Sequence, residues 1–254
     1  MTSEQDRERL LAEAAKYYWY HCVELAPGVV TDGAFDMTPV LPEYRFPDHM
    51  TGMDVLDVGR ASGFFAFEFE RRGARVVATD IASLADWDWV GGDEDKAARL
   101  AAHAAHSAED HISGAFRFAK AARGSSVEEK TVNVYDLDPA VFGGRKFDLV
   151  FAGSIASHLR DPILAFERLR SVTKGTCIVA APSFDIPAVA GQAMLSLVGT
   201  ADEDRRSWWL MNARGLTETL ACAGFAKIEV VSHLQLRHRH MPLAVDHLVA
   251  HAEP

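Results

Sequence analysis

A glycine-containing turn between an apolar run and a helical stretch is the feature that most constrains this chain. The turn, residues 57–63 (Asp-Val-Gly-Arg-Ala-Ser-Gly), begins within the last residues of the apolar run 55–58. It directly precedes residues 64–72, whose pattern predicts a helix. In open parallel sheets, ligands bind beyond the carboxyl ends of the strands, and glycine lets the backbone approach a ligand closely. The turn therefore predicts an α/β fold with a nucleotide-like cofactor at this position.

The remaining chain alternates short apolar runs with helical stretches. This alternation is typical of a doubly wound, mainly parallel sheet with helices on both faces. The last two strands follow each other closely and could form an antiparallel edge. Beyond the turn, the pattern predicts strands at residues 75–80, 131–135, 147–152, 177–181, 227–232 and 243–250, and helices at residues 162–172 and 215–223.

Neither a repeat nor a linker divides the chain, so we expect a single domain over residues 1–254. Helical spacing over residues 4–20 predicts an N-terminal helix, which with the loop after it forms a helical cap over residues 1–50. Residues 51–254 then form the core. An insertion at about residues 84–126 follows the second strand.

Charge and cysteine content limit the function classes. Lys and Arg total 26 against 36 Asp and Glu, and the formal net charge of −10 argues against a general nucleic-acid or anionic-membrane binder. Cys22, Cys177 and Cys222 lack the spacing of a disulfide framework or a zinc site. With a polar N-terminus and no long apolar run, the chain is expected to be cytoplasmic and not membrane-inserted.

The details of the turn favour one kind of cofactor over another. A dinucleotide fingerprint needs glycines at positions 59, 61 and 64, but the chain has Ala61 and Phe64. Asp80 ends the next predicted strand, 21 residues after Gly59, where its two oxygens could accept both hydroxyls of a ribose. Dinucleotide binding is therefore the weaker option.

At this point the sequence resembles the class I S-adenosylmethionine (SAM) dependent methyltransferases, whose first motif runs Asp-x-Gly-x-Gly-x-Gly. Here the middle glycine is Ala61. Four further segments follow in the family's order over roughly residues 50–232, namely Asn133–Leu137, Phe147–Phe151, His158–Pro162 and Ala223–Phe225. The resemblance implies a Rossmann-like, seven-stranded fold, SAM as the cofactor and S-adenosylhomocysteine (SAH) as its product.

The resemblance also implies roles for individual residues. The turn would cradle the methionine part, Asp80 would bind the ribose, and Ile81 would cover one face of the adenine. Asn133 and Val134 would meet the adenine edge. The alternatives are an ordinary tight turn, a helix cap at Asp80 and turn chemistry at Asn133. Ala152 and Gly153 would line the pocket near the sulfonium. The expected cofactor-binding set is therefore Asp57, Gly59, Arg60, Ala61, Ser62, Gly63, Asp80, Ile81, Asn133, Val134, Ala152 and Gly153.

The segment Trp19–Asp36 looks like the branch related to tRNA wobble-uridine carboxymethyltransferases. Relatives that use carboxy-SAM read its extra carboxylate with basic side chains, yet no lysine occurs between Lys16 and Lys96. This departure favours ordinary SAM. The acidic balance also disfavours a tRNA-sized partner, so a small-molecule acceptor is the better expectation.

Two histidines are candidate catalytic bases. His158 follows the fourth predicted strand, where acceptors usually sit in this fold, and its unperturbed pKa of about 6.5 suits proton transfer near neutrality. Alternatively, it bonds the backbone and shapes the loop. His21 could close the pocket from the N-terminal segment, or be an interfacial histidine beside aromatic residues.

Tryptophans are the candidate acceptor wall. Trp19, Trp208, Trp209 and Asn212 are the expected substrate-binding residues, with core packing as the alternative. The insertion aromatics Trp87, Trp89, Phe116 and Phe118 could supply another wall.

His233, His238 and His240 lack a carboxylate partner, and the runs 93–95 and 202–204 are expected to be solvated helix starts, so we predict no metal site.

The sequence thus predicts a methyltransferase acting on an O or N nucleophile of a small molecule, for instance a specialised metabolite. A homodimer is left open. The alternatives are a tRNA wobble-uridine (carboxy)methyltransferase, a non-catalytic SAM-binding or regulatory subunit and, more remotely, a dinucleotide-dependent oxidoreductase.

Overall fold

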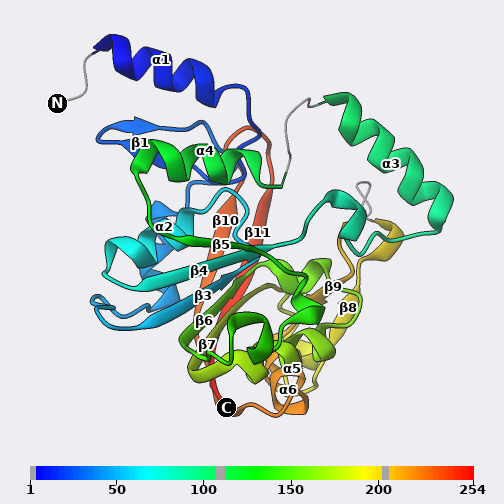
Figure 1. Ribbon diagram of the computed structural model, residues 1–254. Helices are drawn as coiled ribbons and strands as arrows, with labels where there is room; N and C mark the ends of the chain where they lie inside the picture. The colour runs from blue at the N-terminus through cyan, green and yellow to red at the C-terminus, as the bar shows by residue number, and fades with distance from the viewer. Residues whose placement is uncertain (1–3, 107–111, 202–205) are drawn as a thin grey trace.

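The computed structural model describes residues 4–106, 112–201 and 206–254 and is built around a seven-stranded sheet (Figure 1). The strands are β3 (Asp54–Val58), β4 (Arg75–Asp80), β5 (Glu128–Thr131), β6 (Phe147–Gly153), β7 (Thr173–Pro182), β10 (Ala226–Arg237) and β11 (Ala244–Glu253). Their order is β10-β11-β7-β6-β3-β4-β5. The pairs from β5 to β7 are parallel, whereas β11 is antiparallel to both β7 and β10. The predicted mainly parallel sheet with an antiparallel edge is confirmed.

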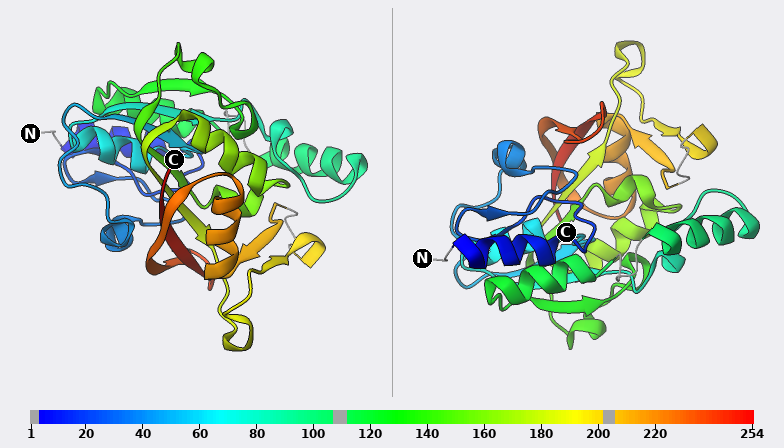
Figure 2. Two further views of the ribbon diagram at one scale, coloured as in Figure 1. Left: turned by 90° about the horizontal axis from the view of Figure 1, so that it is seen from below. Right: turned by 90° about the horizontal axis from the view of Figure 1, so that it is seen from above.

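Helices cover both faces of this sheet (Figures 1 and 2). They are α2 (Phe64–Arg71) and α4 (Gly114–Arg123) on one face, and α5 (Pro162–Val172) and α6 (Ala213–Cys222) on the other. Successive strand residues point to opposite faces. In β6, Phe151 packs with the α2 side and Val150 with the α5 side. The fold is therefore doubly wound, as predicted.

The sheet order places a crevice beyond the end of β3. The chain crosses from β3 to β4 on one side and later returns to β6 on the other, so both neighbours of β3 run parallel to it. Val58 is in register with Thr79 of β4 and Ala152 of β6. Such a reversal of strand order opens a ligand crevice at the carboxyl ends of the strands.

The N-terminal helix is shorter than predicted. The helix α1 (Glu4–Ala14) ends before the aromatic run, because the indole N–H of Trp19 donates to the Ala14 carbonyl, 2.8 Å away, and turns the chain back. The cap that follows is mostly extended chain with two short strands, β1 (Glu24–Ala26) and β2 (Val29–Val30), and a 3-10 helix, η1 (Thr38–Tyr44). The prediction of a helix over residues 4–20 is therefore wrong beyond residue 14.

The insertion is smaller than predicted. The connection from β4 to β5 contains η2 (Leu84–Asp86), α3 (Asp93–His106) and α4. The helix α4 buries Ala115, Phe116 and Ala119 in the core, so it is an ordinary crossover helix of the sheet. In contrast, α3 projects from the body in all three ribbon views (Figures 1 and 2). The acidic residues 93–95 start α3 and are exposed, as predicted, whereas residues 202–204 lie outside the described ranges.

The predicted strand at residues 131–135 is wrong. The strand β5 ends at Thr131, and the 3-10 helix η3 (Val134–Asp136) follows. The Oδ1 atom of Asn133 accepts the N–H of Tyr135, 3.1 Å away, and this side-chain bond replaces a strand hydrogen bond. The other short elements are η4 (Pro139–Phe142), η5 (Ile155–His158), η6 (Pro187–Val189), η7 (Gly199–Ala201), β8 (Leu195–Leu197) and β9 (Trp209–Met211).

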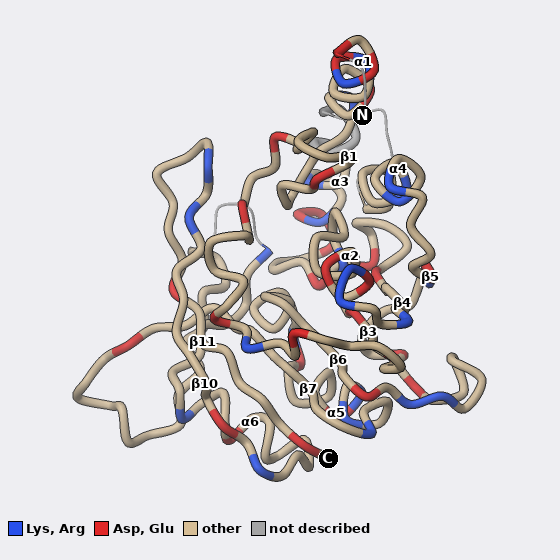
Figure 3. The backbone as a smooth tube through the Cα atoms, turned by 90° about the vertical axis from the view of Figure 1, so that its left-hand side faces the viewer, with Lys and Arg blue, Asp and Glu red and all other residues tan. Residues whose placement is uncertain are grey.

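Charged residues are spread over many elements, and basic and acidic positions are interspersed along the described chain (Figure 3). Within the described ranges, none of the helices is long and apolar enough to cross a membrane.

Candidate cofactor and active site

Gly59, just beyond the end of β3, lines two cavities. The first encloses about 520 Å³, including open space at its mouth, and the second about 320 Å³ on the same basis. The first is lined by Val58, Gly59, Asp80, Ile81, Asp86, Trp87, Asp88, Val132, Asn133, Val134, Tyr135, Ile155, His158 and Leu159. The second is lined by Tyr20, His21, Met37, Gly59, Ala61, Phe65, Phe151, Gly153, Ser154 and Leu236. The turn predicted from the sequence therefore borders both cavities through Gly59.

The turn is held in left-handed backbone conformations. Gly59 has φ +77°, Gly63 has φ +91°, and Ala61 has φ +47°, a conformation that costs a residue with a side chain on the order of 1 kcal/mol. The N–H groups of Gly59 and Arg60 both donate to the Thr79 carbonyl. The turn is therefore anchored on the end of β4.

Asp80 fastens the turn and lines the first cavity. Its Oδ2 accepts the N–H of Ala61 (3.0 Å), and its Oδ1 accepts the N–H of Ile81 (2.9 Å). A carboxylate offers about four lone-pair positions. Asp80 therefore both fastens the turn and presents a carboxylate at the first cavity.

Arg60 lies away from both cavities. Its guanidinium, 1% exposed, lies 2.8 Å from Glu129 and 3.6 Å from Asp80, donates to Ser113, and sits 4.5 Å from the centre of the Phe116 ring. The geometry speaks against the predicted cofactor contact, because the side chain turns under the loop to join α4 and β5. The sequence of a tight turn does not indicate in which direction a long side chain such as that of Arg60 points.

Ser62 and Asp57 lie outside both cavities. The Ser62 hydroxyl accepts the N–H groups of Tyr20 and His21, which ties the N-terminal cap to the turn. Asp57 is 2% exposed, and burial, with the nearby Asp80 charge, raises its pKa to about 7. Ser62 fastens the cap to the turn, Asp57 is a buried carboxyl at the end of β3, and neither residue lines a cavity.

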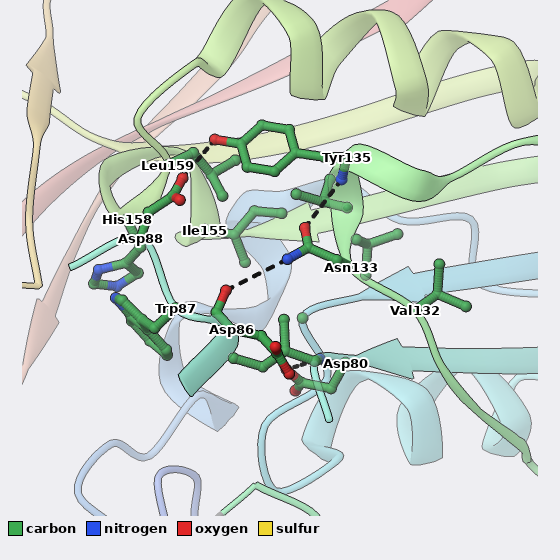
Figure 4. Close-up of a pocket in the computed structure, with 14 residues that line it drawn as sticks. Asp80, Asp86, Trp87, Asp88, Val132, Asn133, Tyr135, Ile155, His158 and Leu159 are labelled. Carbon is green, nitrogen blue, oxygen red and sulfur yellow. Dashed lines mark hydrogen bonds between the residues drawn. The ribbon is translucent and has the colours of Figure 1, made fainter. Parts of the chain in front are cut away.

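The first cavity has an apolar body with a few polar groups (Figure 4). Ile81 and Val134 line it beside Asp80 and Asn133, and these are the four residues expected from the sequence to contact an adenosine. The Nδ2 of Asn133 donates to the Asp86 carbonyl, 3.4 Å away. In contrast, Ala152 is fully buried and lines neither cavity, whereas Gly153 lines the second.

Residues 86–88 form one wall of the first cavity. From the sequence, Trp87, Trp89, Phe116 and Phe118 were equal candidates for such a wall. Trp87 lines the cavity, with its ring centre 4.9 Å from that of His158. Asp88 accepts from the Tyr135 hydroxyl (2.6 Å) and the Arg160 N–H (2.8 Å). The other candidates, Trp89, Phe116 and Phe118, pack elsewhere.

His158 is bonded to the backbone. Its Nδ1 lies 2.8 Å from the carbonyl oxygen of Arg206. Since a carbonyl only accepts, Nδ1 carries the proton when the ring is neutral. With its ring against Trp87, His158 lines the first cavity and not the second, a placement that favours the loop-shaping alternative.

His21 lines the second cavity from the N-terminal cap. It is 5% exposed, lies edge-on to Phe65, and its Nδ1 has no hydrogen-bond partner in the part of the chain that the structure describes. Burial lowers the pKa of His21 to about 3, so the ring is neutral at neutral pH. A buried polar atom beside a cavity is a contact point for a ligand.

Replacing His21 by leucine should change the pH dependence of stability. The unfolded chain protonates this histidine below about pH 6.5, whereas the folded chain does not until about pH 3, so the wild type loses stability as pH falls through this window. The unfolding free energy of His21→Leu relative to wild type should rise by about 2 kcal/mol between pH 7.5 and pH 5. Urea titrations at both pH values measure this, and a constant difference would show that His21 is not buried as a neutral ring.

The predicted substrate residues mostly have structural roles. Trp19 packs beside Phe118, and Trp208 donates its indole N–H to the Asp88 carbonyl, 2.6 Å away. Trp209 donates to the Arg160 carbonyl, and Asn212 caps α6 through the N–H of Gly215. None of the four lines either cavity, which speaks against direct acceptor contacts. Trp208 contributes to the first cavity indirectly, because its hydrogen bond to Asp88 fixes the segment that carries Trp87.

The C-terminal histidines lie outside both cavities. His238 accepts the N–H of His240 and packs against Phe35. Within the described residues, no group of three or more His, Cys, Asp or Glu could hold a metal ion.

Comparison with known proteins identifies the fold of this chain but assigns it to no family. No family model matches the sequence, and no curated protein matches it. Among solved structures, the chain is similar to the N-terminal domain of EvdMO1 with SAH bound, at 16% identity and TM-score 0.63, covering 100% of this chain and 98% of that one. It covers 49% of the whole EvdMO1 structure, at 18% identity and TM-score 0.57.

A second neighbour is the 1,6-didemethyltoxoflavin-N1-methyltransferase of Burkholderia thailandensis, with its substrate and SAH bound. This match has 18% identity and TM-score 0.52, over 86% of this chain and 80% of that one. The chain therefore has the Rossmann-like fold found in SAM-dependent methyltransferases.

Proposed function

We propose that this protein is a SAM-dependent methyltransferase that transfers a methyl group to an oxygen or nitrogen of a small molecule. The observation that carries this proposal is that Gly59 lines two cavities, one also lined by Asp80 and Asn133 and the other by His21 and Ser154. Neighbours of the same fold were crystallised with SAH.

The first cavity suits an adenosine. Its apolar lining from Ile81, Val134 and Leu159 matches the faces of a purine, and the Asp80 carboxylate is the group that we assign to the ribose. Trp87 would exclude water from this part of the site. The left-handed turn at Gly59 lets the ligand pass close to the backbone into the second cavity.

The chemistry needs positioning more than acid–base catalysis. When bound, SAM supplies a methyl group on a positively charged sulfur. The chain's own residues then hold the acceptor in line with that methyl group at near-contact distance, and most of the rate enhancement of such a displacement comes from this alignment. We assign His158 to shaping the Trp87 wall, in place of the catalytic base that its sequence position suggested.

The second cavity favours a small acceptor. It is narrow, with Phe65, Phe151 and Met37 among its walls, and the cap that closes it is fastened to the turn through Ser62. The net charge of −10 gives no general attraction for a polyanion such as tRNA. The 1,6-didemethyltoxoflavin-N1-methyltransferase neighbour, crystallised with bound 1,6-didemethyltoxoflavin, also supports a small acceptor.

Replacing Asp80 by alanine should weaken SAH binding. The variant loses the carboxylate for the ribose and the bonds that fasten the turn, so we expect a loss of about 1–3 kcal/mol, or roughly 5- to 150-fold in Kd. Isothermal titration calorimetry measures the change. Asp136→Ala, an exposed carboxylate that lines neither cavity, is the matched control and should keep wild-type affinity. Unchanged affinity in a folded Asp80→Ala variant would refute the ribose assignment.

Transfer of a labelled methyl group tests the proposal as a whole. Purified protein is incubated with methyl-labelled SAM and either a panel of hydroxylated and amino-bearing metabolites or bulk tRNA. We expect label in a small molecule. Label in tRNA would contradict the proposed acceptor class, and SAH binding without transfer to any acceptor would favour a regulatory subunit.

A further inference from the structure

A serine and a histidine that are distant in sequence meet at the second cavity. Ser154 follows β6 and lines the cavity, and its Oγ lies 3.0 Å from Nε2 of His247 in β11. The serine has φ +61° and ψ +4°, a left-handed conformation that is uncommon for a residue with a side chain. Its N–H donates to the Ala180 carbonyl, so the backbone is held in place. Non-glycine residues in this conformation concentrate at functional sites.

The direction of the Ser154–His247 hydrogen bond follows from the other ring nitrogen. Nδ1 of His247 lies 3.0 Å from the carbonyl oxygen of Val245, which can only accept, so Nδ1 carries a proton. The side chain is 3% exposed, and burial lowers its pKa to about 4, with the neighbouring His158 lowering it and Asp246 raising it. The ring is therefore neutral, its Nε2 has a free electron pair, and the Ser154 hydroxyl must donate to it.

This fixed direction determines what Ser154 offers to the cavity. Because its only proton is engaged by His247, its oxygen presents lone pairs alone to a ligand. A ligand group that donates a hydrogen bond gains a partner there. A ligand group that has no hydrogen to donate leaves the Ser154 oxygen unpaired and binds more weakly. Sites whose buried polar groups would stay unpaired discriminate strongly against such ligands.

We propose that Ser154 reads the N–H or O–H group of the methyl acceptor, and that His247 is the positioning residue that keeps the serine oxygen in the accepting state. This inference rests on the proposed function and deepens it, because it restricts the acceptor to a nucleophile that still bears a hydrogen. A fully substituted nitrogen or an already methylated oxygen is rejected at this point. When an O–H or a secondary N–H group is methylated, its hydrogen leaves as a proton to water, and the product no longer donates a hydrogen bond to Ser154.

Matched fragment pairs test the proposal without knowledge of the natural acceptor. Protein saturated with SAH is titrated with phenol and anisole, and with aniline and N,N-dimethylaniline, by ligand-observed NMR. The aromatic walls Phe65 and Phe151 suit such probes. We expect phenol and aniline to bind at least about tenfold more tightly than their methylated partners. Ser154→Ala should reduce this preference to about twofold or less.

Two controls separate recognition from folding. Ser157→Ala removes a hydroxyl that donates to the Ser154 carbonyl and should keep the preference. Ser154→Gly also removes the hydroxyl but relieves the left-handed backbone, so equal loss of preference in the glycine and alanine variants assigns the effect to the hydroxyl. The tautomer is read from the nitrogen-15 shifts of His247 at pH 7, where Nε2 should be the unprotonated nitrogen and should shift in Ser154→Ala.

The failures of the two proposals are distinguishable. If SAH does not bind, the proposed function itself is refuted before any fragment is added. If SAH binds and the preference for phenol is absent, or persists in Ser154→Ala, Ser154 does not read the acceptor. A tenfold weaker affinity of Ser154→Ala for SAH would show that the serine accepts from the ammonium group of the cofactor, which also overturns the proposal. A protonated Nε2 in His247 would overturn the assigned bond direction.

Discussion

Gly59→Val should reduce the affinity for SAH at least about 100-fold. Gly59 has φ +77°, a conformation in which a residue with a Cβ atom is strained, and an added Cβ would lie 2.4 Å from the Cγ2 methyl of Ile155. Ile155 lines the first cavity. Relief of the clash therefore pushes Ile155 into the space that we assign to adenosine, and the valine methyl groups add to the obstruction at a position that lines both cavities.

Calorimetry with SAH measures the effect, and a second glycine provides the control. Gly144 has φ +83° but nothing within 4 Å of an added Cβ, so Gly144→Val carries backbone strain without a clash. We expect it to lose some stability and to bind SAH like wild type. If Gly59→Val folds and binds SAH with near-normal affinity, the cofactor does not pass the turn as proposed.

Arg60→Met should lower the free energy of unfolding by about 3–5 kcal/mol. The arginine is 1% exposed and compensates the charges of Glu129 and Asp80, while its side chain fills the space over Phe116. Removing one partner of a buried ion pair leaves a charge without compensation, which is the costly case. The methionine keeps much of the apolar volume, so the loss reports mainly the charge and its hydrogen bonds.

Arg117→Met is the matched control, because Arg117 pairs with the same Glu129 from a side chain that is 55% exposed. An exposed pair contributes little, so we expect a change below about 1 kcal/mol. Urea unfolding followed by circular dichroism compares the two variants. If Arg60→Met were as stable as Arg117→Met and instead lost SAH binding, Arg60 would be a cofactor contact and the structural assignment would be wrong.

The sequence allowed prediction of those parts of the fold that local patterns determine. The strand, turn and helix at residues 54–71 and the helix α5 lie where the alternation places them, since hydrophobic period and turn chemistry act over a few residues. The errors have identifiable local competitors. The Trp19 indole stops α1 at Ala14, and the side chain of Asn133 ends the predicted strand early.

The candidate site was predictable where it depends on strand ends and not where it depends on side-chain direction. Asp80 and Asn133 line the first cavity because Asp80 ends β4 and Asn133 follows β5, the adjacent parallel strand. Arg60 belongs to the same turn, yet its direction is set by Glu129, which lies 69 residues away in the chain. Ser154 and His247 are 93 residues apart and meet only because β11 inserts beside β7. Such pairings depend on sheet order, which periodicity does not encode.

The most direct measurement is calorimetric titration of the wild-type protein with SAM, SAH, carboxy-SAM and NAD under one set of conditions. The proposed site predicts binding of SAM and SAH in the micromolar range, with a large preference over NAD because the turn has Ala61 and Phe64 where a dinucleotide site needs glycines. Selective binding of carboxy-SAM would return the tRNA-modifying alternative to first place. Binding of NAD in preference to SAH, or of none of the four, would contradict the assignment of the two cavities.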